Sequence, residues 1–136
     1  MKKFMVLILS LVSMFILSSC TTTNNSSLRG FYQSEVTTDG YVIQISIQPD
    51  ENSFVEYIGN RQVNSGTYDV LGDKKYTLVG DNQTIKIALD KNNSFEIIIK
   101  KVNGGNPVVL KNIDKVPTYF RTEFDDIDKY KALLEE

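Results

Sequence analysis

The segment Tyr41-Val42-Ile43-Gln44-Ile45-Ser46-Ile47-Gln48 repeats its apolar side chains with a period of two. Successive side chains of a β-strand point to opposite faces of its sheet. Tyr41 and the three isoleucines therefore share one face, whereas Val42, the two glutamines and Ser46 share the other. An amphipathic helix would instead repeat its apolar residues every 3.6 positions. The segment predicts a strand with one face in a hydrophobic core.

Similar runs lie on both sides of this segment, separated by turn-forming pairs such as Asp39-Gly40, Gly59-Asn60 and Gly72-Asp73. The runs cover residues 28–37, 41–48, 53–58, 61–70, 75–79, 83–89, 94–101 and 107–110. About eight short strands with polar turns predict an all-β fold, an antiparallel up-and-down meander. Such a meander closes most simply into a small barrel without sheet edges. An open sandwich or a half-barrel is the alternative.

Charged residues in these runs are expected on the outside of the barrel. Lys86, Glu96 and Lys100 would lie on the face that a membrane-spanning barrel presents to lipid, which must be apolar. We therefore expect a barrel outside the membrane. Ile98 falls among the outward residues and is expected to be partly covered. The carboxylates that could form a glycosidase pair are also expected on the surface: Glu35, Glu56, Asp69 and Glu96.

The last part of the sequence changes character. Residues 111–120 are too apolar for a free tail and predict an ordered loop. Thr122 is a candidate cap for a helix over residues 123–134, whose first turn is acidic, as the helix dipole favours. An apolar stripe at helical spacing consists of Phe124, Ile127, Tyr130 and Leu134. We expect this stripe to pack on the barrel or plug one mouth, the alternative being an exposed handle for a partner.

The N-terminus has the pattern of a targeting signal. Two lysines precede an apolar stretch at residues 4–17, which is short for a membrane-spanning helix. Leu17-Ser18-Ser19-Cys20 resembles the lipobox of bacterial lipoproteins. That resemblance implies cleavage between Ser19 and Cys20 and lipid attachment, including palmitate, at Cys20. It divides the chain into a signal peptide (1–19), a flexible tether (20–27) and one domain (28–136).

The barrel part resembles the lipocalin-like barrel lipoproteins of bacteria, which include the N-terminal domain of the NlpE envelope-sensing family. The resemblance lies in the lipobox, the short tether, the opening Gly30-Phe31-Tyr32 and the repeated Gly66-Thr67-Tyr68 pattern. It implies a small barrel held at the cell membrane or outer membrane, facing the extracytoplasmic side. The early Cys-x-x-Cys pair of NlpE-like domains is missing, so copper handling and thiol sensing do not carry over.

Composition removes several classes of function. The sequence has no His and one Cys, so it lacks the usual general base, a catalytic triad and a multi-Cys zinc site. After residues 1–19 are removed, 13 basic and 17 acidic residues give a net charge of −4, which disfavours nucleic acid. The acidic group at residues 125–128 lacks the glycine and terminal glutamate of a calcium-binding EF-hand loop. We expect no metal, no cofactor and no enzymatic activity.

The sequence therefore predicts a membrane-anchored, non-enzymatic binding module for a small apolar ligand or an envelope protein. Residues that would line a ligand cavity are Tyr41, Ile43, Tyr68, Ile87 and Ile97. The alternative is a structural, signalling or exclusion lipoprotein with a solid barrel that acts through its rim or its C-terminal helix.

Overall fold

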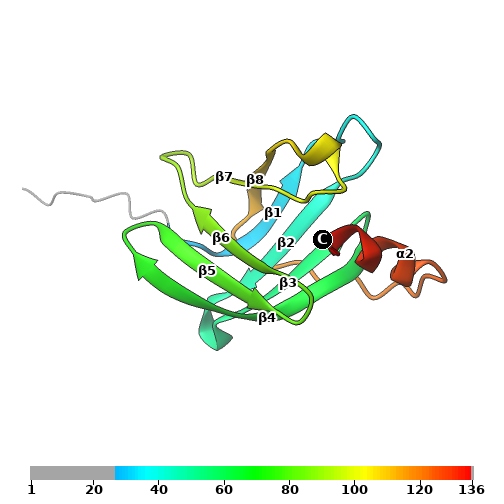
Figure 1. The fold of residues 1–136 in the computed structure, drawn as a ribbon. Helices are drawn as coiled ribbons and strands as arrows, with labels where there is room; N and C mark the ends of the chain where they lie inside the picture. The colour runs from blue at the N-terminus through cyan, green and yellow to red at the C-terminus, as the bar shows by residue number, and fades with distance from the viewer. Residues whose placement is uncertain (1–26, 136) are drawn as a thin grey trace, which may run out of the picture.

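Eight antiparallel strands form a nearly closed, barrel-like sheet in the computed structural model, which describes residues 27–135 (Figure 1). The strands are β1 (Gly30–Ser34), β2 (Ile43–Gln48), β3 (Ser53–Ile58), β4 (Arg61–Gly72), β5 (Lys75–Gly80), β6 (Thr84–Ala88), β7 (Phe95–Ile97) and β8 (Val108–Asp114). One short helix, α2 (Ile127–Lys131), follows, and 3₁₀ turns are η1 (Pro49–Glu51), η2 (Asn103–Gly105) and η3 (Ala132–Leu134). The predicted all-β meander is confirmed.

Short connections join most of the consecutive strands that pair, from β2 to β6. At the β3–β4 turn, Gly59 and Asn60 both have positive φ, at 56° and 67°. Two such residues give the connection whose twist matches that of the flanking strands. The turn predicted at these two residues is therefore confirmed.

The sheet order is β6-β5-β4-β3-β2-β1-β8-β7, so the first strand pairs with the last. This pairing runs from Phe31 opposite Asp114 to Ser34 opposite Leu110. The sheet nevertheless has two edges, because no ladder joins β6 to β7 in the described residues. In Figure 1 these two strands diverge from the turn that joins them. The expectation of a barrel without edges is corrected at this opening, which we call the β6–β7 seam.

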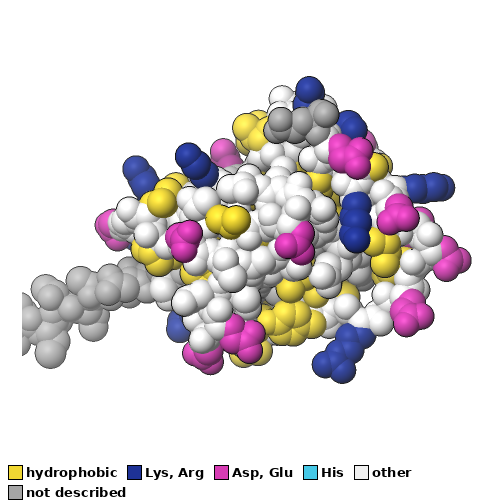
Figure 2. Space-filling view, turned by 60° about the horizontal axis from the view of Figure 1, so that its bottom comes forward, with side chains coloured by type: hydrophobic (Ala, Val, Ile, Leu, Met, Phe, Trp, Pro, Cys, Tyr) yellow, Lys and Arg dark blue, Asp and Glu magenta, His cyan; other side chains and the backbone are white. Residues whose placement is uncertain are grey.

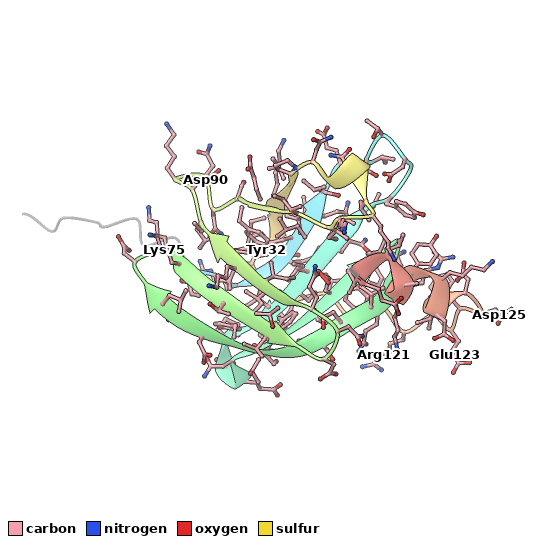
Figure 3. All side chains as sticks on the ribbon, in the orientation of Figure 1. Tyr32, Lys75, Asp90, Arg121, Glu123 and Asp125 are labelled. Atoms are coloured by element: carbon pink, nitrogen blue, oxygen red, sulfur yellow. The ribbon has the colours of Figure 1, made fainter. Side chains whose placement is uncertain are left out.

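The interior face of every strand contributes to one apolar core. Ile43, Ile45 and Ile47 are all fully buried, as the period of two predicts. Figure 3 shows Tyr32 inside the barrel, whereas the other labelled side chains project from its two ends. The buried apolar cluster includes at least one residue from each strand: Tyr32, Ile43, Phe54, Val63, Leu78, Ile85, Phe95 and Leu110.

The outer face of β2 is covered by the chain itself. Gln44 and Ser46 are buried although they lie on the polar face of this strand. The backbone N–H of Thr118 donates to Ser46 Oγ at 3.0 Å, and the Ser46 hydroxyl donates back to the Thr118 carbonyl. Nearby, the Phe120 ring packs edge-on against Tyr57, with centroids 4.9 Å apart. By contrast, Ile98 is 61% exposed, so the expected cover over β7 is wrong.

The C-terminal helix covers one mouth of the barrel (Figure 1). Leu134 is buried in the core, and the Tyr130 ring packs edge-on against Tyr41 with centroids 5.9 Å apart. The expected packing of the apolar stripe is confirmed for Tyr130 and Leu134, whereas Phe124 and Ile127 are not part of the core cluster. The helix is shorter than predicted, since it begins at Ile127 after Asp126 and not after Thr122.

Candidate functional site

The residues predicted to line a ligand cavity lie in the packed interior. Ile43, Tyr68, Ile87 and Ile97 belong to the buried core cluster. Tyr41 is partly buried and packs against that cluster near the C-terminal helix. The predicted cleavage and lipid-attachment residues, Ser19 and Cys20, lie outside the described residues.

Glu56 is the residue whose position differs most from the expectation. It was expected on the surface because it is charged, but it is fully buried. Its neighbours two positions away in β3, Phe54 and Ile58, are both core residues. Because side chains at i and i±2 share a face, Glu56 points into the barrel with them. The period of two therefore predicts an inward Glu56, but its charge suggested a surface position.

The carboxyl group of Glu56 has no hydrogen-bond partner on either oxygen within the described residues. Its cross-strand neighbours are Ile45 on β2 and Asn64 on β4. Burial raises the pKa of Glu56 from 4.5 to about 8. The Asn64 amide, which faces Glu56 across the strands, partly offsets this rise in pKa. At neutral pH the group is therefore mostly a neutral carboxylic acid in apolar surroundings.

Asn64 ties the interior of the barrel to the turn that begins β6. Its Oδ1 accepts from the backbone N–H groups of Asn82, at 2.9 Å, and Gln83, at 3.3 Å. Its Nδ2 donates to the Gln83 carbonyl at 3.0 Å. A Cβ on Gly80 would lie 2.1 Å from Asn64 Oδ1, so this glycine makes room for the amide. The side chain facing Glu56 is thus held in place by the β5–β6 turn.

Tyrosine hydroxyls hold the chain at the start of the domain. The Tyr32 hydroxyl donates to Asn93 Oδ1 at 3.3 Å and accepts from the Arg29 N–H at 3.3 Å. The Tyr76 hydroxyl accepts from the Leu28 N–H at 3.4 Å. Burial raises the pKa of Tyr32 above its ordinary value of 10.0. The Tyr32 hydroxyl is therefore a neutral hydrogen-bonding group at physiological pH.

Arg61 fixes the segment before the helix over the mouth. Its Nε and Nη2 donate to the two carboxylate oxygens of Asp126, at 2.8 and 3.0 Å. Its guanidinium carbon also lies 4.0 Å from the ring centroid of Phe124 and 4.3 Å from that of Tyr130. The hydrogen bonds from Arg61 lower the pKa of Asp126. One acid of the 125–128 group thereby has a structural role at the barrel mouth.

Two surface hollows lie along the β6–β7 seam. One, of about 320 Å³, is lined by residues of β6 and β7 and by Ile98 and Pro107. The other, of about 410 Å³, lies toward the turn at residues 89–94. Lys86 and Glu96 line both hollows. No ion pair between these two side chains is found in the described residues.

A third hollow, of about 390 Å³, lies between residues 35–38, which follow β1, and the first half of β8, and it includes the exposed Val36 and Val109. Figure 2 shows another view of the surface, with acidic and basic side chains interspersed among small apolar areas. The remaining candidate carboxylates, Glu35, Asp69 and Glu96, are exposed, as expected.

In residues 27–135, no group of three His, Cys, Asp or Glu side chains is arranged to hold a metal ion. No helix of this part has the length and apolar character needed to cross a membrane. In comparisons with family models, curated proteins and solved structures, none matches this chain.

Proposed function

We propose that this protein is a lipid-anchored, extracytoplasmic binding module that recognises a protein partner and catalyses no reaction. The observation that carries the proposal is the filled barrel. The buried apolar cluster has members from all eight strands, and the C-terminal helix adds Leu134 to it. A barrel interior filled by side chains leaves the outer surface as the place for recognition.

The outer surface offers apolar contacts of the kind that a protein partner uses. Ile98, Val36 and Val109 are exposed beside the hollows. Contiguous apolar patches with a polar rim mark interaction sites, so these residues are candidate contacts for a partner. The lipobox ending at Cys20 supports a position at a membrane surface, since two or three acyl chains give a stable anchor.

A second candidate is the binding of a small amphipathic ligand inside the barrel. Glu56 favours it, because a buried carboxyl group with two unsatisfied oxygens would gain from a ligand that donates a hydrogen bond. Such a ligand would have to displace core side chains. Mass spectrometry of solvent extracts of the purified protein, with Glu56→Leu as the control, tests this candidate. A ligand enriched in the wild type alone would support it.

Site-specific photocrosslinking in the bacterial envelope tests the protein-partner proposal. A photoreactive residue replaces Ile98, and a matched chain carries it at the exposed Asp69 on β4. We expect one discrete adduct from position 98 and none from position 69. Cys20→Ala should abolish acyl labelling and reduce the adduct. Equal adduct patterns from both positions would contradict the proposal, as would acyl labelling of the Cys20→Ala chain.

A further inference from the structure

The β4–β5 hairpin extends past the strand on the other side of β4. Pairing between β3 and β4 ends at Thr67, whereas the pairing of β4 with β5 continues to Gly72. Residues 70–75, which we call the hairpin tip, therefore have no strand beside them on the β3 side in the described part of the chain. Val70 is 66% exposed and Leu71 is 60% exposed. The tip thus presents two adjacent apolar side chains to its surroundings.

The start of the domain lies between the hairpin tip and the end of β8. The Leu28 N–H donates to the Tyr76 hydroxyl at 3.4 Å, and Tyr76 is the cross-strand partner of Val70. On the other side, the Asn112 side chain donates to the Arg29 carbonyl at 3.0 Å. The first residues of the domain therefore connect the hairpin tip to β8 across this end of the barrel.

The end of β8 carries a second pair of exposed apolar side chains. Ile113 is 60% exposed and Val116 is 65% exposed. A Cβ on Gly30 would collide with the Asp114 carbonyl, so the backbones of the domain start and of β8 are in close contact here. Exposed apolar side chains thus lie on both sides of the point where the chain enters the domain. Apolar side chains that gather in this way mark a contact with a membrane or a protein.

Basic side chains outnumber acidic ones where these segments meet. We call residues 28–30, 70–75 and 112–116 together the entry face. Its charged residues give a net charge of +2, in a mature chain with a net charge of −4: Arg29, Lys74, Lys75, Lys115, Asp73 and Asp114. The Asp114 carboxylate accepts the Val116 N–H at 3.0 Å. The acids of η1, Asp50 and Glu51, lie outside the entry face, between β2 and β3.

The predicted lipid anchor lies close to the entry face. Cys20 precedes Leu28 by eight positions, so the two residues are at most about 28 Å apart even along a fully extended chain. The C-terminal helix lies at the opposite end of the barrel, and Figure 3 shows Lys75 at one end and Glu123 at the other. Acyl chains at Cys20 would therefore keep the entry face, and not the helix-covered mouth, near the bilayer.

We propose that the entry face docks on the membrane surface, an inference that rests on the lipid anchor of the proposed function. The two apolar pairs enter the headgroup region, and Lys74 and Lys75 contact lipid phosphates. The anchor makes docking an intramolecular event, so contacts that are too weak to bind a free domain are sufficient. Docking directs the helix-covered mouth away from the membrane and leaves Ile98, on the outer side of the barrel, accessible to a protein partner.

Fluorescence quenching by lipids tests the docking. The sequence has one Cys, which acylation consumes, so Leu71→Cys provides a single site for a thiol-reactive dye. The chain, purified with its anchor, is reconstituted in vesicles of phosphatidylcholine and the anionic lipid phosphatidylglycerol that contain a nitroxide-labelled lipid. Val36→Cys is the matched control, because Val36 is 68% exposed and lies in the β1–β2 loop, whose Tyr41 packs on the C-terminal helix. Ile113→Cys provides a second probe in case Leu71→Cys does not fold, as judged by its far-UV spectrum.

We expect the nitroxide to quench the dye at positions 71 and 113 several-fold more strongly than at position 36. Combining Lys74→Glu with Lys75→Glu should lower the docking equilibrium constant about tenfold or more, because each lysine at an anionic surface contributes about fivefold. The exposed pair Lys100 and Lys101 lies at the helix end, where Lys101 donates to the Ala132 carbonyl. The same charge reversal at this pair should leave the quenching at position 71 unchanged.

Equal quenching at positions 71 and 36 of the acylated protein would overturn the docking alone. Emission from position 71 that depends on protein density and not on the quencher would assign the entry face to a second copy of the chain, and would also overturn the docking. A wild type whose Cys20 still reacts with the dye would refute the anchor, and with it both proposals.

Discussion

Replacing Glu56 by Gln should stabilise the protein at neutral pH and flatten its pH dependence. Glutamine has nearly the same shape as glutamic acid but cannot ionise. In the wild type, the pKa is raised from 4.5 to about 8 by burial, so folding takes up a proton between these pH values. The stability contribution is fully present below pH 4.5 and is lost as the pH rises through about 8.

The size of the effect follows from the pKa values. One pKa unit corresponds to about 1.4 kcal/mol, so the rise to about 8 predicts a total loss of about 5 kcal/mol from well below pH 4.5 to well above pH 8. Roughly 3 kcal/mol of that loss is present at pH 7. Near pH 4 the Gln variant should match the wild type or be slightly less stable, because its amide is also buried without a partner.

Urea unfolding at pH 4, 7 and 8.5 measures these differences directly. Glu96→Gln is the matched control, because Glu96 is exposed on β7 and should leave the pH dependence of the wild type unchanged. The reasoning is refuted if the free energies of unfolding of Glu56→Gln and the wild type follow parallel pH profiles. It is also refuted if the Gln variant is the less stable protein at pH 8.5.

Other substitutions test the packing. Ile45→Ala should lower the free energy of unfolding by about 2–5 kcal/mol, whereas Lys86→Glu should change it by no more than about 0.5 kcal/mol, both measured by urea unfolding. Gly80→Ala should lower the free energy of unfolding by about 1–3 kcal/mol, because the new Cβ would collide with the Asn64 amide. Gly72→Ala is the control, since a Cβ at Gly72 meets nothing within 4 Å. The difference in thermal midpoint between the two variants checks this. Arg61→Ala should speed amide exchange in the C-terminal helix without changing exchange in β5; unchanged exchange in the helix would contradict the anchoring role of its carboxylate and aromatic contacts.

Local patterns were sufficient for the strands and the turns. The alternation in residues 41–48 identified the buried isoleucines of β2 correctly, although the strand begins at Ile43. The β3–β4 turn was predicted because Gly59 and Asn60 both accept positive φ. These features depend on residues that are close together in the sequence. One sequence is therefore enough to predict them.

Features that depend on distant segments could not be predicted in the same way. The burial of Ser46 depends on Thr118, which lies 72 positions away. The position of the seam depends on β1 pairing with β8, a choice that no local pattern encodes. Glu56 is a different case, since its inward direction follows from Phe54 and Ile58. For Glu56, the general rule that charged residues lie on the surface gave the wrong prediction, and the strand period gave the right one.

The pairing of β1 with β8 has a consequence for how the chain folds. Phe31 and Asp114 are opposite each other across a sequence separation of 83 residues, whereas β2 to β6 form successive hairpins with short turns. Hairpins form on the microsecond scale, but a contact between distant segments requires closure of a long loop. Until residues 108–114 pair with it, β1 has an exposed edge and the core lacks Leu110. A chain in which this last pairing has not formed therefore exposes a strand edge to other chains and an incomplete core to proteases.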